Sequence, residues 1–101
     1  MSSIVKSLKL LADPTRLRLL LLLGEEELSV VEIQEILGMG QSRISSHLAQ
    51  LKAARLVLDR RAGKNIYYGR AGHHDGPFKE IIAASAGDIP EAAHDLSLIH
   101  I

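Results

Sequence analysis

The polar side chains of residues 41–50, QSRISSHLAQ, can form hydrogen bonds along one surface of a helix. Three serines within a turn and a half cost a helix about 0.5 kcal/mol each relative to alanine, so a purely structural helix would seldom contain them. Short hydroxyl side chains suit a helix that fits closely into the major groove of DNA. The alternative is an ordinary polar face in solvent. The residues expected to contact DNA from this segment are Gln41, Ser42, Arg43, Ser45, Ser46 and His47.

Positive charge is concentrated in the middle of the chain. The whole chain has no net charge, but residues 41–70 contain seven lysines and arginines and one acid, and both flanking segments are acidic. A basic stretch of this kind is typical of a surface that faces phosphates, and a solvated charged face is the simpler alternative. Within this stretch, the side chains expected to contact the DNA backbone are Arg60, Arg61 and Lys64.

The composition excludes other classes of protein. The chain has no cysteine, so it can form neither a disulfide nor a thiolate metal site. No spacing of residues assembles a nucleophile with a base or a pair of carboxylates, so we expect neither an enzyme nor a bound cofactor. The longest apolar run, residues 19–23, is far too short to span a bilayer. These features predict a protein of the cytoplasm without a membrane segment.

Two helices are predicted at the start of the chain. Residues 2–11 place apolar side chains at helical spacing. A second helix begins at Asp13-Pro14, because Asp13 can cap free amide groups and Pro14 loses no hydrogen bond at the first helical position. This leucine-rich helix is expected to end at Gly24 and to lie in the centre of the core.

Two further helices are joined by the glycine turn at residues 38–40. Ser29 and Glu32 match a capping box ahead of a third helix over residues 30–37. The fourth helix is predicted over residues 41–54. Its narrow apolar stripe, which we expect to be buried, consists of Ile44, Leu48 and Leu51.

A hairpin and a last helix complete the pattern. Residues 56–61 and 66–70 read as two strands joined by a tight turn. Tyr67 and Tyr68 alternate along the second strand, so one of them should pack on the core and the other should lie near the surface. A helix follows over residues 76–86, with a short helical stretch from Pro90. Two short helices followed by a basic hairpin are the layout of a winged helix-turn-helix.

Two apolar stripes have no partner left in so small a domain, and they predict a homodimer. A two-fold dimer would place two DNA-reading helices about one DNA turn apart and would bind a palindromic operator. The stripes lie on the first and last helices. They consist of Ile4, Val5, Leu8 and Leu11, and of Phe78, Ile81 and Ile82.

The segment from Asp13 to Arg70 resembles the ArsR/SmtB family of bacterial repressors. The similarity lies in ADPTRLRLL (12–20), SVVE (29–32), QSRISSHLAQLKAARLV (41–57) and RRAGKNIYY (60–68). The resemblance implies a mainly α fold with a small β-hairpin wing, in helices–hairpin–helix order. It also implies that Gln41, Ser42, Ser45 and His47 lie on the recognition helix, that the first and last helices form the dimer interface, and that the protein is a homodimeric repressor.

The chain departs from the metal-sensing members of that family. Those members carry a Cys-x-Cys type site near the third helix, where this chain has LSVVEI (28–33). A second family site pairs Asp and His residues on the last helix, and His73, His74, His94 and His100 do not have that spacing. We therefore expect no metal site and no release from DNA by zinc, cadmium or arsenite. The sequence does not identify an inducer.

The end of the chain has two interpretations. Residues 1–86 are expected to form the DNA-binding and dimerisation domain, and residues 87–101 a C-terminal extension. GDIPEAAHDL (87–96) resembles the stretch that follows the winged helix in members fused to a methyltransferase domain, so the alternative function is the regulatory fragment of such a fusion. LSLIHI (96–101) breaks the helical pattern and resembles a truncated or foreign end.

Overall fold

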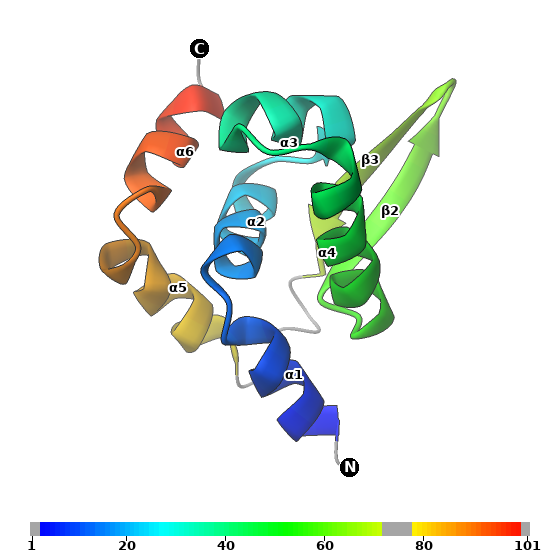
Figure 1. The fold of residues 1–101 in the computed structure, drawn as a ribbon. Helices are drawn as coiled ribbons and strands as arrows, with labels where there is room; N and C mark the ends of the chain where they lie inside the picture. Colours follow the sequence, from blue (N-terminus) through cyan, green and yellow to red (C-terminus); the bar gives the residue numbers. More distant parts are fainter. Residues whose placement is uncertain (1–2, 72–77, 100–101) are drawn as a thin grey trace.

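The computed structural model describes residues 3–71 and 78–99 and has a winged helix-turn-helix architecture (Figure 1). The predicted fold class is therefore confirmed. In chain order the elements are α1 (Ser3–Leu11), α2 (Pro14–Glu25), β1 (Leu28–Ser29), α3 (Val30–Leu37), α4 (Gln41–Ala53), β2 (Val57–Ala62), β3 (Asn65–Arg70), α5 (Lys79–Asp88) and α6 (Ala92–Ile99).

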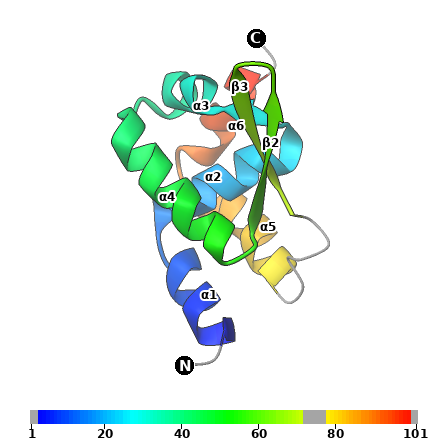
Figure 2. The ribbon, with the colours of Figure 1, turned by 90° about the vertical axis from the view of Figure 1, so that its right-hand side faces the viewer.

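Helix α2 occupies the centre of the molecule, as its leucine content predicts. Leu19, Leu20 and Leu22 are completely buried, and Leu23 is nearly so. These leucines point in several directions around the helix, so α2 packs against α1, α5, α6 and β3 at once. Figures 1 and 2 show α2 between the helix-turn-helix and the C-terminal helices.

Both predicted helix starts are capped by side chains. The Asp13 carboxylate accepts hydrogen bonds from the amides of Thr15 and Arg16 at 2.8 and 3.2 Å. Ser29 and Glu32 form the reciprocal capping box, in which each side chain bonds the other residue's amide at 3.3 and 2.9 Å. These bonds satisfy amide groups that a helix leaves without a partner in its first turn.

The turn between α3 and α4 depends on Gly38. Its φ of +67° lies in the left-handed region, which is the usual end of a helix and which glycine adopts without a steric penalty. Gly40 precedes α4, and the stripe of Ile44, Leu48 and Leu51 on α4 is buried as predicted. The turn therefore sets α4 across the core and leaves its opposite face outside.

Helix α4 ends in a second left-handed turn that leads into the wing. The amide of Leu56 donates to the carbonyl of Leu51, and the amide of Arg55 to that of Lys52, both at 2.9 Å. These two bonds form a Schellman motif, whose left-handed residue is usually glycine. Here that residue is Arg55, with a φ of +62°.

The sheet has three antiparallel strands in the order β1-β3-β2. β2 and β3 form the predicted hairpin, in which Arg60 lies opposite Tyr67. β1 was not expected: Leu28 and Ser29 pair with Tyr68 and Tyr67, respectively. Two residues are too few to show a strand's alternating pattern, and the segment reads instead as the end of an acidic linker.

Helix α6 is joined to α2 by a buried ion pair. The guanidinium of Arg18 donates two hydrogen bonds, from Nε and Nη2, to the two carboxylate oxygens of Asp95 at 2.7 and 2.9 Å. The Asp95 side chain is only 2% exposed. This bidentate geometry satisfies the charge of the buried Asp95 carboxylate, while the Arg18 side chain remains partly exposed.

Several predicted boundaries differ from the structure by one to three residues. α2 continues one residue past Gly24, and α5 starts at Lys79 and runs to Asp88. The expected helical stretch after Pro90 is α6, but the expectation that residues 96–101 break its amphipathic pattern is wrong as far as the chain is described. α6 continues to Ile99, because Leu96 and Ile99 fall three residues apart and pack on the core.

The two predicted apolar stripes are only partly free. Leu11, Phe78 and Ile82 are buried within the chain itself, so the prediction that they lack a partner is wrong. Leu11 at the end of α1, Phe78 at the N-cap of α5 and Ile82 on α5 all pack in the core cluster. The members that remain exposed are Ile4, Val5, Leu8 and Ile81, at 51, 39, 45 and 46%.

Asp95→Ala is expected to lower the free energy of unfolding by about 1.5–3 kcal/mol, because it removes the charged acceptor of two hydrogen bonds from the half-buried Arg18. Urea unfolding measures this change. Asp88→Ala removes an exposed carboxylate from the end of α5 and should change stability by less than about 0.5 kcal/mol. Equal losses in the two variants would contradict the role given to the ion pair.

Candidate nucleic-acid interface

The face of α4 opposite its buried stripe carries only small side chains. Ser42, Ser46 and Ala49 are exposed and follow one another at helical spacing. A line of small residues lets a helix backbone approach another surface closely, and the two hydroxyl groups supply hydrogen bonds there. The described residues give neither serine side chain a hydrogen-bond partner, so both are available to a ligand.

Gln41 and Ser45 occupy the side of α4 next to that line. The side-chain amide of Gln41 donates a 2.7 Å hydrogen bond to the Ser45 hydroxyl. The bond holds the Gln41 side chain along the helix at its first turn. Contact with a base through the Gln41 amide group would therefore exchange an existing hydrogen bond rather than add one.

Arg43 and His47 lie on the other side of α4, towards the start of α2. Arg43 Nη2 donates to the Thr15 hydroxyl at 3.4 Å, and His47 Nδ1 lies 3.5 Å from Arg16 Nη1. Burial lowers the pKa of His47 below its ordinary value of 6.5; the nearby Asp13 carboxylate opposes this shift and the two arginines add to it. His47 is therefore neutral at pH 7 and half-buried.

Arg16 links three helices, and sequence reasoning did not single it out. Its Nε donates to the carbonyl of Leu10 at 2.7 Å, and its Nη1 donates to Gln50 Oε1 at 2.6 Å. Its Nη2 lies 3.8 Å from Asp13 Oδ2. The only sequence signal was its place after Asp13-Pro14, which predicts the helix start but no contact with α4.

Arg60 of the wing is held in place by two neighbours. Its guanidinium donates to both carboxylate oxygens of Glu27, at 3.1 and 3.2 Å, and lies over the ring of Tyr67 at 5.4 Å from its centre. Tyr68 packs on the core, so the expected split between the two tyrosines is confirmed. A phosphate would have to compete with Glu27 for the charge of Arg60.

Arg61 and Lys64 are cations of the wing that form no ion pair within the described residues. Both are exposed, Lys64 lies in the hairpin turn, and the described part of the chain gives neither an ion pair. Lys52, which belongs to the same basic segment, is paired with Asp59 at 2.8 Å, and this bond lowers the pKa of that carboxyl. The positive charge counted in the sequence is thus partly neutralised by ion pairs.

Neither a metal cluster nor a membrane span is found among the described residues. Within residues 3–71 and 78–99, no three or more His, Asp or Glu side chains are grouped so that they could hold a metal ion. His73, His74 and His100 lie outside the described residues. No helix in the described part of the chain is long and apolar enough to span a membrane.

The comparisons with known proteins agree with this geometry. A family model described as "Bacterial regulatory protein, arsR family" matches residues 13–58, from the cap of α2 into β2. Nodulation protein NolR of Rhizobium meliloti is 35% identical over 94 residues, which cover 91% of this chain and 75% of that protein. The chain belongs to the ArsR family. The resemblance seen in the sequence is therefore confirmed.

Other members share a shorter segment. Arsenic resistance transcriptional regulator ArsR1 of Pseudomonas putida is 49% identical over 61 residues, 59% of this chain and 48% of that protein. A transcriptional repressor SmtB homolog of Synechocystis is 42% identical over 64 residues, 63% of this chain and 48% of that protein. The chain thus spans about half the length of these two relatives.

Solved structures extend the similarity over most of the chain. Reduced HlyU of Vibrio cholerae superimposes with a TM-score of 0.73 at 31% identity, over 87% of this chain and 90% of that one. The Mb0332 fragment of Mycobacterium bovis, described as a homodimeric winged helix-turn-helix DNA-binding domain, has the same TM-score and identity, over 85% and 80%. The arrangement of α3, α4 and the wing is thus a family feature.

The stability of this ArsR-family chain should fall as the pH drops below about 6.5, partly because of His47. Its pKa is lowered in the folded state, so below the ordinary value the unfolded chain binds more protons. His47 thus contributes stability that is present above pH 6.5 and is lost as the pH falls towards its folded pKa. His47→Gln should reduce the loss between pH 7.5 and 5.5, measured by urea unfolding.

His94→Gln is the matched control, because His94 is exposed on α6. This variant should lose as much stability over the same pH interval as the unmodified chain. An unchanged pH dependence in His47→Gln would show that the burial of His47 does not affect folding.

Proposed function

We propose that this chain is a sequence-specific DNA-binding transcriptional repressor that acts as a homodimer on a palindromic operator in the cytoplasm. The observation that carries the proposal is the exposed line of small side chains on α4, which stands beside a wing bearing Arg61 and Lys64. Hydroxyl groups that fit a groove and cations that meet phosphates are the two components of DNA recognition.

Homology supports the same function. ArsR1 is named as a transcriptional regulator, the SmtB homolog as a transcriptional repressor, and the Mb0332 fragment as a homodimeric DNA-binding domain. These names favour a regulator over the alternative of a fragment from a methyltransferase fusion. We assign DNA binding to Gln41, Ser42, Arg43, Ser45, Ser46, His47, Arg60, Arg61 and Lys64.

The exposed apolar side chains of α1 and α5 support a dimer. Both helices lie at the end of the molecule away from the tip of the wing (Figures 1 and 2). Ile4, Val5, Leu8 and Ile81 are all more than a third exposed, which is unfavourable in a monomer in water. A two-fold contact through these helices would cover them and leave both copies of α4 free for DNA.

Arg61→Ala should weaken binding to all duplexes alike and reduce the salt dependence of the affinity by about one unit of slope, because one phosphate contact is lost. Fluorescence anisotropy over a series of salt concentrations measures both effects. Lys79→Ala on α5 removes an exposed charge outside the proposed DNA-binding surface and should leave the slope of the salt dependence unchanged. If Arg61→Ala behaves in the same way, the wing does not contact DNA.

Ser42→Ala should cost about 1–3 kcal/mol on a preferred site selected from random duplexes, and much less on unrelated DNA, because the hydroxyl contacts a base edge. Ser97→Ala on α6 is the matched control and should change neither affinity. A loss of the same size on both kinds of DNA would mean that Ser42 only positions the backbone.

Leu8→Glu should convert the protein to a monomer at micromolar concentration, because a charge in the centre of an apolar interface cannot be solvated. Sedimentation velocity measures the mass. Val31→Glu changes an equally apolar, 62% exposed side chain on α3 and should remain dimeric. A dimer that survives Leu8→Glu would exclude this face of α1 as the interface.

A further inference from the structure

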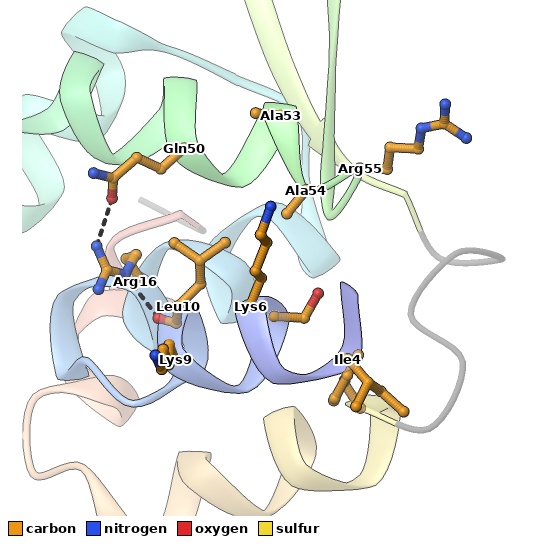
Figure 3. A pocket seen from close by; sticks show the side chains of 11 residues that line it. Ile4, Lys6, Lys9, Leu10, Arg16, Gln50, Ala53, Ala54 and Arg55 are labelled. Atoms are coloured by element: carbon orange, nitrogen blue, oxygen red, sulfur yellow. Dashed lines mark hydrogen bonds between the residues drawn. The ribbon is translucent and has the colours of Figure 1, made fainter. Parts of the chain in front are cut away.

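Helix α1 and the second half of α4 enclose a groove of about 1000 Å³ (Figure 3). Its apolar lining includes Ile4, Leu10 and Phe78, together with two alanines near the end of α4. No acidic side chain is among the described residues that line it. The cations that line it are Lys6, Lys9, Arg16 and Arg55.

Two of these side chains define where a ligand would bind. Lys6 reaches from α1 towards the end of α4, and Arg16 lies at the other end of the groove beneath Gln50 (Figure 3). Within the described residues Lys6 has no ion pair, whereas Arg16 lies 3.8 Å from a carboxylate. Arg55 stands at the rim and points outward. The ammonium group of Lys6 is thus the available anchor for a negative charge.

We propose that this groove binds a small organic anion, with its charged group on Lys6 and an apolar body against Leu10 and Phe78. The volume and the mixture of an apolar lining with a few polar groups match those of small-molecule sites. The ammonium group of Lys6, in a lining without a carboxylate among the described residues, favours a negatively charged ligand.

The site also borders the helix assigned to DNA recognition. Arg16 Nη1 donates to Gln50 Oε1 at 2.6 Å, and both residues line the groove. A ligand whose body extends from Lys6 along the groove would reach these two side chains, disturb their hydrogen bond and loosen the attachment of α4 to α2. If the proposed function holds, the ligand is therefore an effector that weakens DNA binding.

Binding is tested first without DNA, by calorimetry of the full chain with 2-naphthoate, 2-naphthyl phosphate and the neutral 2-naphthamide. We expect at least one anion to bind at one site per chain, and the amide to bind much more weakly. The stronger of the two anions identifies a carboxylate or a phosphate as the preferred charged group. The site is disproved if neither anion binds at millimolar concentration or if the amide binds as well.

Lys6→Gln and Lys64→Gln form a matched pair of exposed lysines, one in the groove and one in the wing. Lys6→Gln should weaken anion binding about fivefold, the upper range for an exposed ion pair. Lys64→Gln should leave it unchanged. Equal weakening in both variants would show that the anion responds only to the charge of the whole molecule.

The effector role is tested by anisotropy with a duplex selected from a random pool. The anion should weaken DNA binding by the unmodified chain, and Lys6→Gln should need about fivefold more anion for the same effect. Unchanged DNA affinity at saturating anion would disprove the effector role. If no duplex binds even without anion, the proposed function fails while calorimetry still decides the site.

If the groove bound the DNA backbone or a second copy of the chain instead of an anion, Lys6→Gln would give a different result. Weaker DNA binding in the absence of anion would assign the groove to the DNA backbone. A monomer in sedimentation velocity would assign it to α1 of a second copy. Either result would overturn the proposal.

Discussion

The burial of α2 is the constraint on which the other elements depend. Burying one leucine contributes about 1.5–3 kcal/mol, and Leu19, Leu20, Leu22 and Leu23 bury their side chains in different directions. A helix with apolar residues all round must be enclosed by other elements. α1, α5, α6 and β3 enclose it, and the turn at Gly38 then places α4 with one face on the core and the other in solvent.

Features set by residues close in sequence could be predicted. Asp13 with Pro14, and Ser29 with Glu32, identify helix starts because the capping bonds join residues two or three positions apart. The stripe of α4 is equally local, because three apolar residues at helical spacing require a buried face. These signals were enough for the order of the helices and the hairpin and for the position of α4, but not for β1.

Contacts between distant residues could not be predicted. Arg16 meets Gln50 over 34 positions, and Glu27 meets Arg60 over 33. Nothing in the local pattern of either residue specifies its partner. The same reason explains the errors at Leu11 and Phe78: hydrophobic spacing shows that a side chain needs burial, but not whether its own chain provides it. Counting charges likewise overestimated the free cations of the wing.

The pairing of Arg18 with Asp95 has a consequence for how the chain folds. The two residues are 77 positions apart, so the contact closes most of the chain into one loop. Chains fold from the N-terminus during synthesis, and until Asp95 has been translated, α2 cannot bury Arg18 beside its counter-charge. The nascent helix-turn-helix therefore exists for a time with an incomplete core, which α6 completes once it has emerged and packed on α2.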